Sequence, residues 1–168
     1  MIAARRPDMV YLGQYEANVY FEKASLRLIH PDGGMPYAMC FDDKTEILTE
    51  NGWKLFKDLN KEEKVATFNI KSEKVEWQTP TDYIEQQYNG KMLSILTRRL
   101  DLVITPNHRL LVKRSSNKNW KLIEAEKLEG ERMVTLTSGL SEDPTNYHET
   151  SLPTNFDKIN YDGIIYCV

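Results

Sequence analysis

The sequence predicts a compact all-β fold made of many short antiparallel strands. Short runs of alternating apolar and polar residues recur along residues 40–168, and turn residues separate them. Helical periodicity is limited in this part of the chain to one turn, over residues 124–128. Many short strands at regular spacing, with almost no helix between them, are typical of compact β folds.

Composition narrows the class of protein and its partners. The chain has 168 residues, 40% hydrophobic and 28% charged, which predicts one domain with an appendage or two very small domains. Its formal net charge is −3 without a basic stripe, so we expect no nucleic-acid partner. No run approaches the length of a membrane span, so we also expect no membrane partner. Two cysteines are too few for a disulfide scaffold or zinc site; we expect a cytoplasmic protein without metal or cofactor.

Residues 1–39 differ from the rest of the chain in their pattern of apolar and polar residues. Val19 and Phe21 alternate with polar residues, as do Leu26 and Leu28, which fits a hairpin, but residues 16–28 also fit a single helix. A turn cluster follows at residues 31–34. The segment is too short to bury a core by itself, so we interpret it as a fragment of another protein.

The β part begins with a hairpin signal, an Asn51-Gly52 pair between alternating apolar positions. A second such pair, Asn89-Gly90, predicts another hairpin turn, with its return strand at 91–97. The other predicted strands are 45–49, 65–70, 74–88 with a break at Pro80, 100–105, 108–113, 120–123 and 132–137.

The last part of the chain is predicted to be less regular. Residues 138–158 are rich in Ser, Thr, Pro and Asn, and we interpret them as an irregular surface loop. A turn at Tyr161-Asp162-Gly163 then leads into a short apolar strand. That strand stops without a polar tail at Val168, which suggests that the sequence is cut short.

The chemistry of interest centres on Cys40, which follows a Gly/Pro-rich passage and precedes the first β hairpin. The carbonyl nearest to its thiol is that of Met39. Attack there exchanges an amide for a thioester, which is uphill unless the amide nitrogen is protonated as it leaves. His108 can supply that proton, and the hydroxyl of Thr105 can hold the amide in place.

These residues carry a resemblance to a known family. The run Cys-Phe-Asp-Asp-Lys-Thr-Glu-Ile-Leu-Thr over residues 40–49, with Gly-Trp-Lys at 52–54, resembles the N-terminal splicing block of inteins and other Hint (hedgehog-intein) domains. Residues 102–112, Leu-Val-Ile-Thr-Pro-Asn-His-Arg-Leu-Leu-Val, resemble their Thr-x-x-His block. Residues 161–168 are similar to the opening of their penultimate block. The resemblance covers residues 40–168.

The resemblance implies a fold and an activity. The fold is a flat, horseshoe-shaped Hint domain with pseudo-twofold symmetry. The activity is autocatalytic protein splicing, a single-turnover self-processing reaction that begins with an N-to-S acyl shift at the Met39–Cys40 bond and gives a thioester. In this assignment Cys40 is the nucleophile, His108 the histidine that activates the amide, and Thr105 its hydrogen-bonding partner. Residues 1–39 become an N-extein from an unidentified host.

Three departures from the family pattern leave questions open. The terminal His/Gly-Asn dipeptide and the following Ser, Thr or Cys are missing, so ligation requires a C-terminal segment, supplied downstream or on a second chain as in split inteins. Cys167 replaces a commonly acidic residue after Tyr166; we place it near the active site with its role open. Glu63-Lys64 replaces an expected Gly-Asp, which we predict alters only a turn.

Other interpretations remain beside these. The chain could be a Hint domain that only cleaves its upstream flank, or a β-rich interaction module without chemistry. Cys167 could be a packed strand residue or, if it reaches Cys40, a disulfide partner that holds the nucleophile inactive until reduction. The Asp42-Asp43 pair is interpreted as a solvated turn and not as a metal site, because no third ligand accompanies it.

Overall fold

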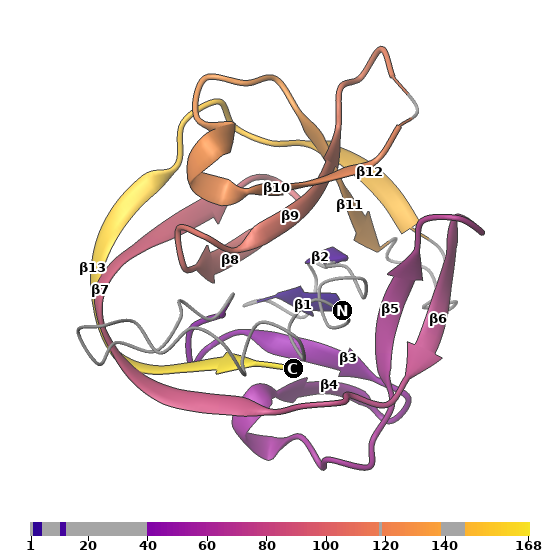
Figure 1. The fold of residues 1–168 in the computed structure, drawn as a ribbon, viewed down its shortest axis with the longest axis vertical. Coiled ribbons are helices and arrows are strands. Elements are labelled where there is room, and N and C mark those ends of the chain that lie inside the picture. The colour runs from indigo at the N-terminus through magenta and orange to yellow at the C-terminus, as the bar shows by residue number, and fades with distance from the viewer. Residues whose placement is uncertain (1, 5–10, 13–39, 118, 139–146) are drawn as a thin grey trace, which may run out of the picture.

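The computed structural model describes residues 2–4, 11–12, 40–117, 119–138 and 147–168. These residues form three antiparallel sheets and two single 3-10 turns, with no α-helix among them. Figure 1 shows β7 and β13 side by side as one long curved ladder. The predicted all-β fold is confirmed. No helix in the described ranges has the length and apolar character needed to span a membrane.

The strands divide among the three sheets as follows. The first sheet holds β1 (Ile2–Ala4), β2 (Tyr11–Leu12), β3 (Glu46–Thr49), β4 (Gly52–Leu55), β5 (Val65–Asn69) and β6 (Lys74–Gln78). The second holds β9 (Arg109–Lys113), β10 (Lys121–Glu124), β11 (Val134–Ser138) and β12 (Tyr147–Ser151). The third holds β7 (Ile84–Leu96), β8 (Asp101–Ile104) and β13 (Asp157–Cys167), and the 3-10 turns are η1 (Phe56–Asp58) and η2 (Ala125–Leu128).

The element order repeats, which is the predicted pseudo-twofold symmetry. A hairpin, a 3-10 turn, a second hairpin and a long strand follow one another as β3-β4-η1-β5-β6-β7. The same succession recurs as β9-β10-η2-β11-β12-β13. The two long strands, β7 and β13, then pair antiparallel along the whole of β13 and join the two halves.

The Asn51-Gly52 hairpin is confirmed. Thr49 faces Gly52 across the β3–β4 ladder, and Gly52 has a φ of +103°. Glycine adopts this left-handed conformation without the steric cost that a Cβ brings. The predicted break near Pro80 is also present, because β6 ends at Gln78 and β7 begins at Ile84.

The predicted turns at Asn89-Gly90 and Tyr161-Asp162-Gly163 are wrong. Both lie inside the continuous strands β7 and β13, where Gly90 pairs with Tyr161 and Gly163 pairs with Tyr88. Neither glycine has a φ in the left-handed region that a hairpin turn of this type needs.

The physical reason is a repeated Tyr-x-Gly motif. The ring of Tyr88 lies over Gly90, with its hydroxyl 2.8 Å from where a Cβ would stand, and the ring of Tyr161 lies likewise over Gly163 at 2.9 Å. Each hydroxyl also lies 2.8 Å from a carbonyl oxygen three residues on, that of Lys91 or of Ile164. The glycines therefore make room for tyrosine rings along a strand and do not reverse the chain.

The predicted irregular loop over residues 138–158 is also wrong in part. Within it, β12 pairs with β11 along five residue pairs, and β13 already begins at Asp157. His148 and Glu149 in β12 are exposed. A strand exposed to this extent lacks the apolar alternation by which a strand is identified in sequence.

The segment before Cys40 is described only in two short pieces. Ala3 and Ala4 of β1 pair with Ile47 and Glu46 of β3, and β1 also pairs with β2. The predicted hairpin or helix over residues 16–28 and the turn at 31–34 lie outside the described residues. The domain boundary between residues 39 and 40 stays a prediction.

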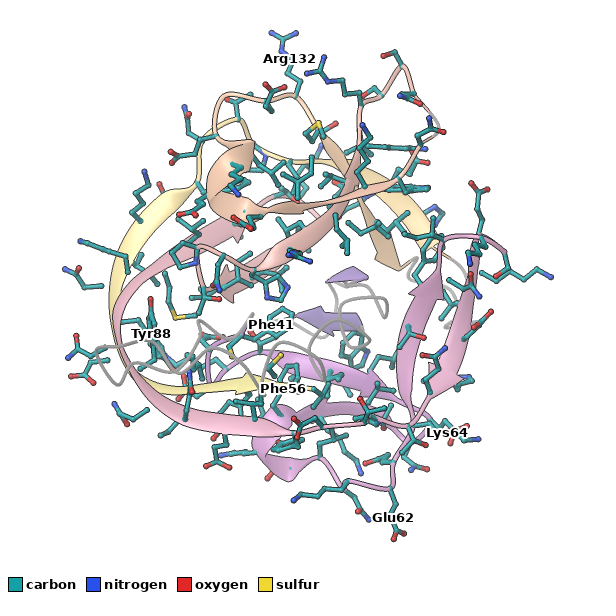
Figure 2. The ribbon with its side chains drawn as sticks, viewed as in Figure 1. Phe41, Phe56, Glu62, Lys64, Tyr88 and Arg132 are labelled. Carbon is teal, nitrogen blue, oxygen red and sulfur yellow. The ribbon has the colours of Figure 1, made fainter. Side chains whose placement is uncertain are left out.

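Both halves of the repeat contribute to the largest apolar cluster. Phe41 stacks on Phe56 with ring centroids 5.3 Å apart, and Phe56 stacks on Tyr166 at 6.3 Å. Leu110, Val112 and Leu128 of the second half belong to the same cluster. Figure 2 shows Phe41 and Phe56 in the interior, while Glu62, Lys64 and Arg132 lie at the periphery. The residue after Cys40 is thus anchored in the core.

Candidate active site

The segment that starts at Cys40 lies between two strands of the third sheet. Phe41 forms β-bridges with Ile104 at the end of β8 and with Tyr166 near the end of β13. Its N–H donates to the Tyr166 carbonyl at 2.9 Å, and the Tyr166 N–H donates back at 3.0 Å. Cys40 and Phe41 are both 0% exposed. The predicted nucleophile is therefore enclosed by backbone on two sides.

Thr105 holds the backbone of Cys40 through two hydrogen bonds. The Cys40 N–H donates to Thr105 Oγ1 at 3.1 Å, and the Thr105 N–H donates to the Cys40 carbonyl at 3.0 Å. Thr105 is itself 2% exposed. It occupies this place because the apolar strand β8 ends there and Pro106, which has no N–H, follows.

His108 closes a tight turn after Thr105. Its N–H donates to the Thr105 carbonyl at 3.0 Å. The turn is supported by η2, since Ala125 N–H donates to the His108 carbonyl at 2.8 Å. The imidazole is buried, and its centroid lies 4.5 Å from that of the Phe41 ring, edge to face at 64°. The fold thus brings Cys40, Thr105 and His108 into one neighbourhood; Met39 lies outside the described residues.

Cys167 also reaches this neighbourhood. It packs against the small apolar cluster of Cys40, Met92, Val103 and Ile165. The pKa of the Cys40 thiol is raised, first by a hydrogen bond with the Cys167 sulfur, then by burial and by the charge of Cys167. The Cys40 thiol therefore holds its proton tightly. Cys167 is half-buried, and both cysteines are free thiols.

Two polar contacts beside Cys40 escaped the sequence-based reasoning. Asp42 is 2% exposed and accepts a hydrogen bond from the Thr45 hydroxyl at 2.6 Å, so the prediction of a solvated pair is wrong for Asp42. Asp43 is exposed, and its carboxylate lies 3.0 Å from the Tyr161 hydroxyl. The Asp-x-x-Thr spacing could have indicated the first contact. The second joins residues 118 apart and has no local signal.

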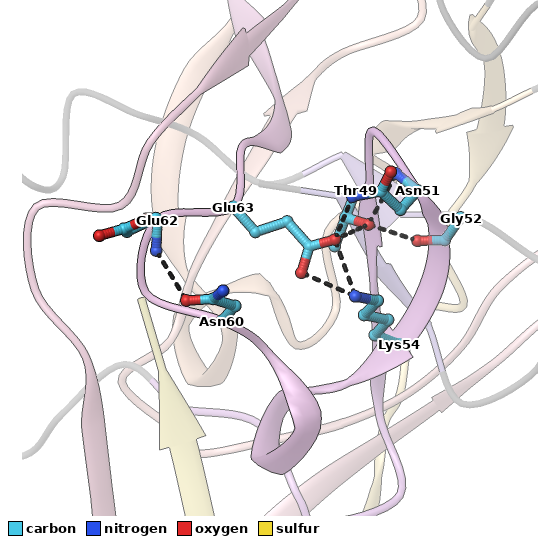
Figure 3. A network of polar contacts seen from close by, with 7 residues as sticks. All are labelled: Thr49, Asn51, Gly52, Lys54, Asn60, Glu62 and Glu63. Atoms are coloured by element: carbon cyan, nitrogen blue, oxygen red, sulfur yellow. Dashed lines mark hydrogen bonds and ion pairs between the residues drawn. The ribbon is translucent and has the colours of Figure 1, made fainter.

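Glu63 does more than alter a turn. Figure 3 shows its carboxylate accepting hydrogen bonds from Thr49 at 3.0 Å, Asn51 at 2.8 Å and Lys54 at 2.9 Å. These bonds, Asn51 first and Lys54 second, lower the pKa of Glu63 to about 2. The network ties the β3–β4 hairpin, which follows the Cys40 segment directly, to the loop before β5.

The chemical capacity of the site is that of a buried thiol beside a restrained backbone amide and an imidazole. Such a set suits acyl transfer to sulfur, with the imidazole moving protons. Within the described ranges, no three His, Cys, Asp or Glu side chains are grouped as metal ligands would be.

Two curated proteins are similar to part of the chain. An ATP-dependent Clp protease proteolytic subunit from Chlamydomonas moewusii is 30% identical over 97 residues, which are 56% of this chain and 10% of that protein. A ribonucleoside-diphosphate reductase subunit beta from Aquifex aeolicus is 30% identical over 77 residues, 45% of this chain and 11% of that protein. The chain thus spans about a tenth of either relative. No protein-family model matches it.

Solved structures resemble most of the chain. The AceL NrdHF class 3 split intein, a GSH-linked splice-inactive variant, has a TM-score of 0.62 at 15% identity and covers 78% of this chain and 84% of its own. The DnaX mini intein from Spirulina platensis reaches 0.59 at 20% identity, covering 76% and 85%. A bacterial intein-like domain from Clostridium thermocellum reaches 0.57 at 18% identity, covering 78% and 86%. At these identities the likeness shows the fold.

Proposed function

We propose that this chain, which has the Hint fold of inteins, is a protein-splicing domain that begins with an N-to-S acyl shift at the Met39–Cys40 peptide bond. One observation carries the proposal: the thiol of Cys40 is fully buried while its own amide N–H is held by Thr105 Oγ1 at 3.1 Å. A thiol buried in this way does not reach an external substrate. The Met39 carbonyl, in contrast, is bonded directly to the Cys40 nitrogen.

In the proposed reaction, Cys40 Sγ attacks the Met39 carbonyl carbon and the bond from that carbon to the Cys40 nitrogen breaks. The products are a thioester and a free amine on Cys40. Thr105 Oγ1 holds the Cys40 N–H in place. As the Met39 carbonyl carbon becomes tetrahedral, the lone pair of the Cys40 nitrogen forms on a side of the nitrogen that this hydrogen bond does not occupy. His108 takes the proton of the thiol and delivers it to that nitrogen.

The raised pKa of the Cys40 thiol is the reason why we assign both proton transfers to His108. At neutral pH a thiol of raised pKa is protonated, and thiolate is the reactive nucleophile. A base near the thiol removes this obstacle, and the same proton then makes the nitrogen a better leaving group. No net proton is consumed in the shift.

Completion of splicing requires groups that residues 40–168 do not contain. There is no His/Gly-Asn dipeptide followed by Ser, Thr or Cys among them. We propose that a C-terminal intein segment with its C-extein supplies these groups, downstream or as a separate chain, and that residues 1–39 are the N-extein. With residues 40–168 alone, the thioester can only be cleaved.

The curated relatives support an inserted domain. Their names describe two different enzymes, and the similarity covers about a tenth of each. A domain that is carried within unrelated hosts produces this pattern.

The test is incubation of the full chain with a thiol or with hydroxylamine. Both nucleophiles cleave a thioester, so wild type is expected to release a fragment of residues 1–39, identified by its mass. Cys40→Ala is expected to release none, whereas Cys167→Ala, which removes the other cysteine, still releases it. Wild type that stays intact with both reagents contradicts the acyl shift.

A further inference from the structure

The register of the Cys40 segment on β13 places the two cysteines opposite each other. Phe41 and Tyr166 exchange both backbone hydrogen bonds, at 2.9 and 3.0 Å, so they are a hydrogen-bonded antiparallel pair. In such a ladder, the residue before Phe41 faces the residue after Tyr166. Cys40 and Cys167 are therefore the next, non-hydrogen-bonded pair, for which Cα atoms lie about 4.5 Å apart. Disulfides span about 4.4–6.8 Å between Cα atoms.

The two thiols differ in access to solvent. Cys40 is 0% exposed, whereas Cys167 is half-buried near the end of β13. A dissolved oxidant or reductant therefore meets the Cys167 sulfur first. Both side chains belong to one apolar cluster with Met92, Val103 and Ile165, so they project to the same side of the ladder.

We propose that Cys40 and Cys167 form a reversible disulfide that switches off the first step of the reaction. The oxidant is a small-molecule disulfide such as glutathione disulfide. The Cys167 thiolate attacks one of its sulfurs and releases one glutathione thiolate. Cys40, after losing its proton, attacks the Cys167 sulfur of this mixed disulfide and releases the second. Two protein thiols are oxidised, and one glutathione disulfide is reduced to two glutathiones.

Once Cys167 is in the mixed disulfide, the Cys40 thiol loses its proton more easily. Two of the causes that raise the pKa of the Cys40 thiol are its hydrogen bond with Cys167 and the charge of Cys167. A Cys167 sulfur in a mixed disulfide cannot be an anion, so the charge of Cys167 no longer raises the pKa of the Cys40 thiol. The intramolecular disulfide is then expected to replace the glutathione adduct.

The consequence rests on the proposed function. A Cys40 sulfur in a disulfide has no thiolate form and cannot attack the Met39 carbonyl, so the acyl shift stops until reduction. Glutathione keeps thiols reduced in a cytoplasm. The acyl shift is therefore expected to proceed in that compartment and to stop under oxidative conditions.

The disulfide itself is tested without reference to cleavage. The full chain is treated with glutathione disulfide and alkylated under denaturing conditions, and its mass is measured by mass spectrometry. Wild type is expected to show no alkylated cysteine and no glutathione adduct, and both cysteines alkylated after a phosphine reductant. Cys167→Ser is expected to keep its buried Cys40 free of adduct. A stable adduct at Cys167 with Cys40 still a thiol, or two unmodified thiols, overturns the proposal.

The switch is tested with reagents that separate reduction from cleavage. Hydroxylamine cleaves thioesters without reducing disulfides, and a phosphine reduces disulfides without being a thiol. Oxidised wild type is expected to stay intact in hydroxylamine and to release residues 1–39 when phosphine is added. Cys167→Ser, treated identically, is expected to release the fragment with or without phosphine.

The outcomes distinguish the two proposals. Oxidised wild type that carries the disulfide yet cleaves in hydroxylamine alone overturns the switch and leaves the acyl shift intact. No cleavage from reduced wild type and from Cys167→Ser contradicts the proposed function and with it the switch, while alkylation still decides whether the disulfide forms.

Discussion

The backbone N–H of Cys40 donates a hydrogen bond to the side-chain oxygen of Thr105 at 3.1 Å, although the two residues are 65 positions apart. The Thr105 N–H returns a bond to the Cys40 carbonyl at 3.0 Å. The residue that carries the candidate nucleophile is thereby fixed to the end of β8. Because both residues are buried, water does not compete for these bonds.

Thr105→Val is expected to slow release of residues 1–39 by about 10- to 100-fold, because a buried N–H without an acceptor costs about 1–3 kcal/mol. Valine has nearly the shape of threonine but no hydroxyl, so the fold is kept. Thr105→Ser restores the acceptor and is expected to cleave close to the wild-type rate. The measurement is the rate of fragment appearance in hydroxylamine under reducing conditions. Equal rates for the valine and serine variants would remove Thr105 from the mechanism.

Tyr161→Phe is expected to slow cleavage more than its symmetry-related counterpart Tyr88→Phe. The Tyr161 hydroxyl contacts the carboxylate of Asp43 at 3.0 Å and the Ile164 carbonyl at 2.8 Å, so it ties the Cys40 segment to β13. Tyr88 makes the equivalent bond to the Lys91 carbonyl at 2.8 Å. Each variant is expected to lose about 1 kcal/mol of unfolding free energy. The measurement is the cleavage rate of the two variants, compared under conditions in which their unfolding free energies are equal. Any remaining difference reports how Tyr161 positions the Cys40 segment. Equal losses of rate in the two variants would assign both tyrosines a purely structural role.

Glu63→Gln is expected to lower the unfolding free energy at neutral pH by about 1–3 kcal/mol, since the carboxylate accepts charge-assisted hydrogen bonds. Its pKa is lowered from 4.5 to about 2 in the folded protein. A lowered folded-state pKa stabilises the protein above pH 4.5, and this contribution is lost as the pH falls from 4.5 towards 2.

The measurement is denaturant unfolding at pH 7 and at pH 3. Wild type is expected to lose more stability between them than Glu63→Gln, which lacks the titrating group. Glu62→Gln, at the exposed neighbouring position, is the matched control. The same acid-dependent loss in Glu63→Gln as in wild type would contradict this role.

Gly90→Ala is expected to destabilise the protein by about 1–2 kcal/mol, because the new Cβ would stand 2.8 Å from the Tyr88 hydroxyl and displace it from the Lys91 carbonyl. In a Tyr88→Ala background the same change is expected to cost almost nothing, since the ring is gone. A double-mutant cycle by thermal or chemical unfolding measures this coupling. Additive effects would show that the ring does not need the glycine.

Local patterns were sufficient for much of the fold. The Asn51-Gly52 hairpin, the break near Pro80 and the single turn at η2 follow from turn chemistry and periodicity over a few residues. They failed at Asn89-Gly90, where the same dipeptide lies inside a strand. They also failed at β12, whose exposed residues lack alternation. In both places pairing with another strand decides the conformation, and for Asn89-Gly90 that strand, β13, is distant in sequence.

The sequence by itself was enough to name Cys40, Thr105 and His108 as candidate site residues, because their residue types and their order along the chain are properties of the sequence. Tertiary structure alone decided that the Thr105 N–H donates back to the Cys40 carbonyl, that Tyr161 reaches Asp43 and that Cys167 faces Cys40. These relationships depend on the register between β8, β13 and the Cys40 segment. Register is set by side chains that pack across strands, and the periodicity of one segment does not specify which strand will pair with it.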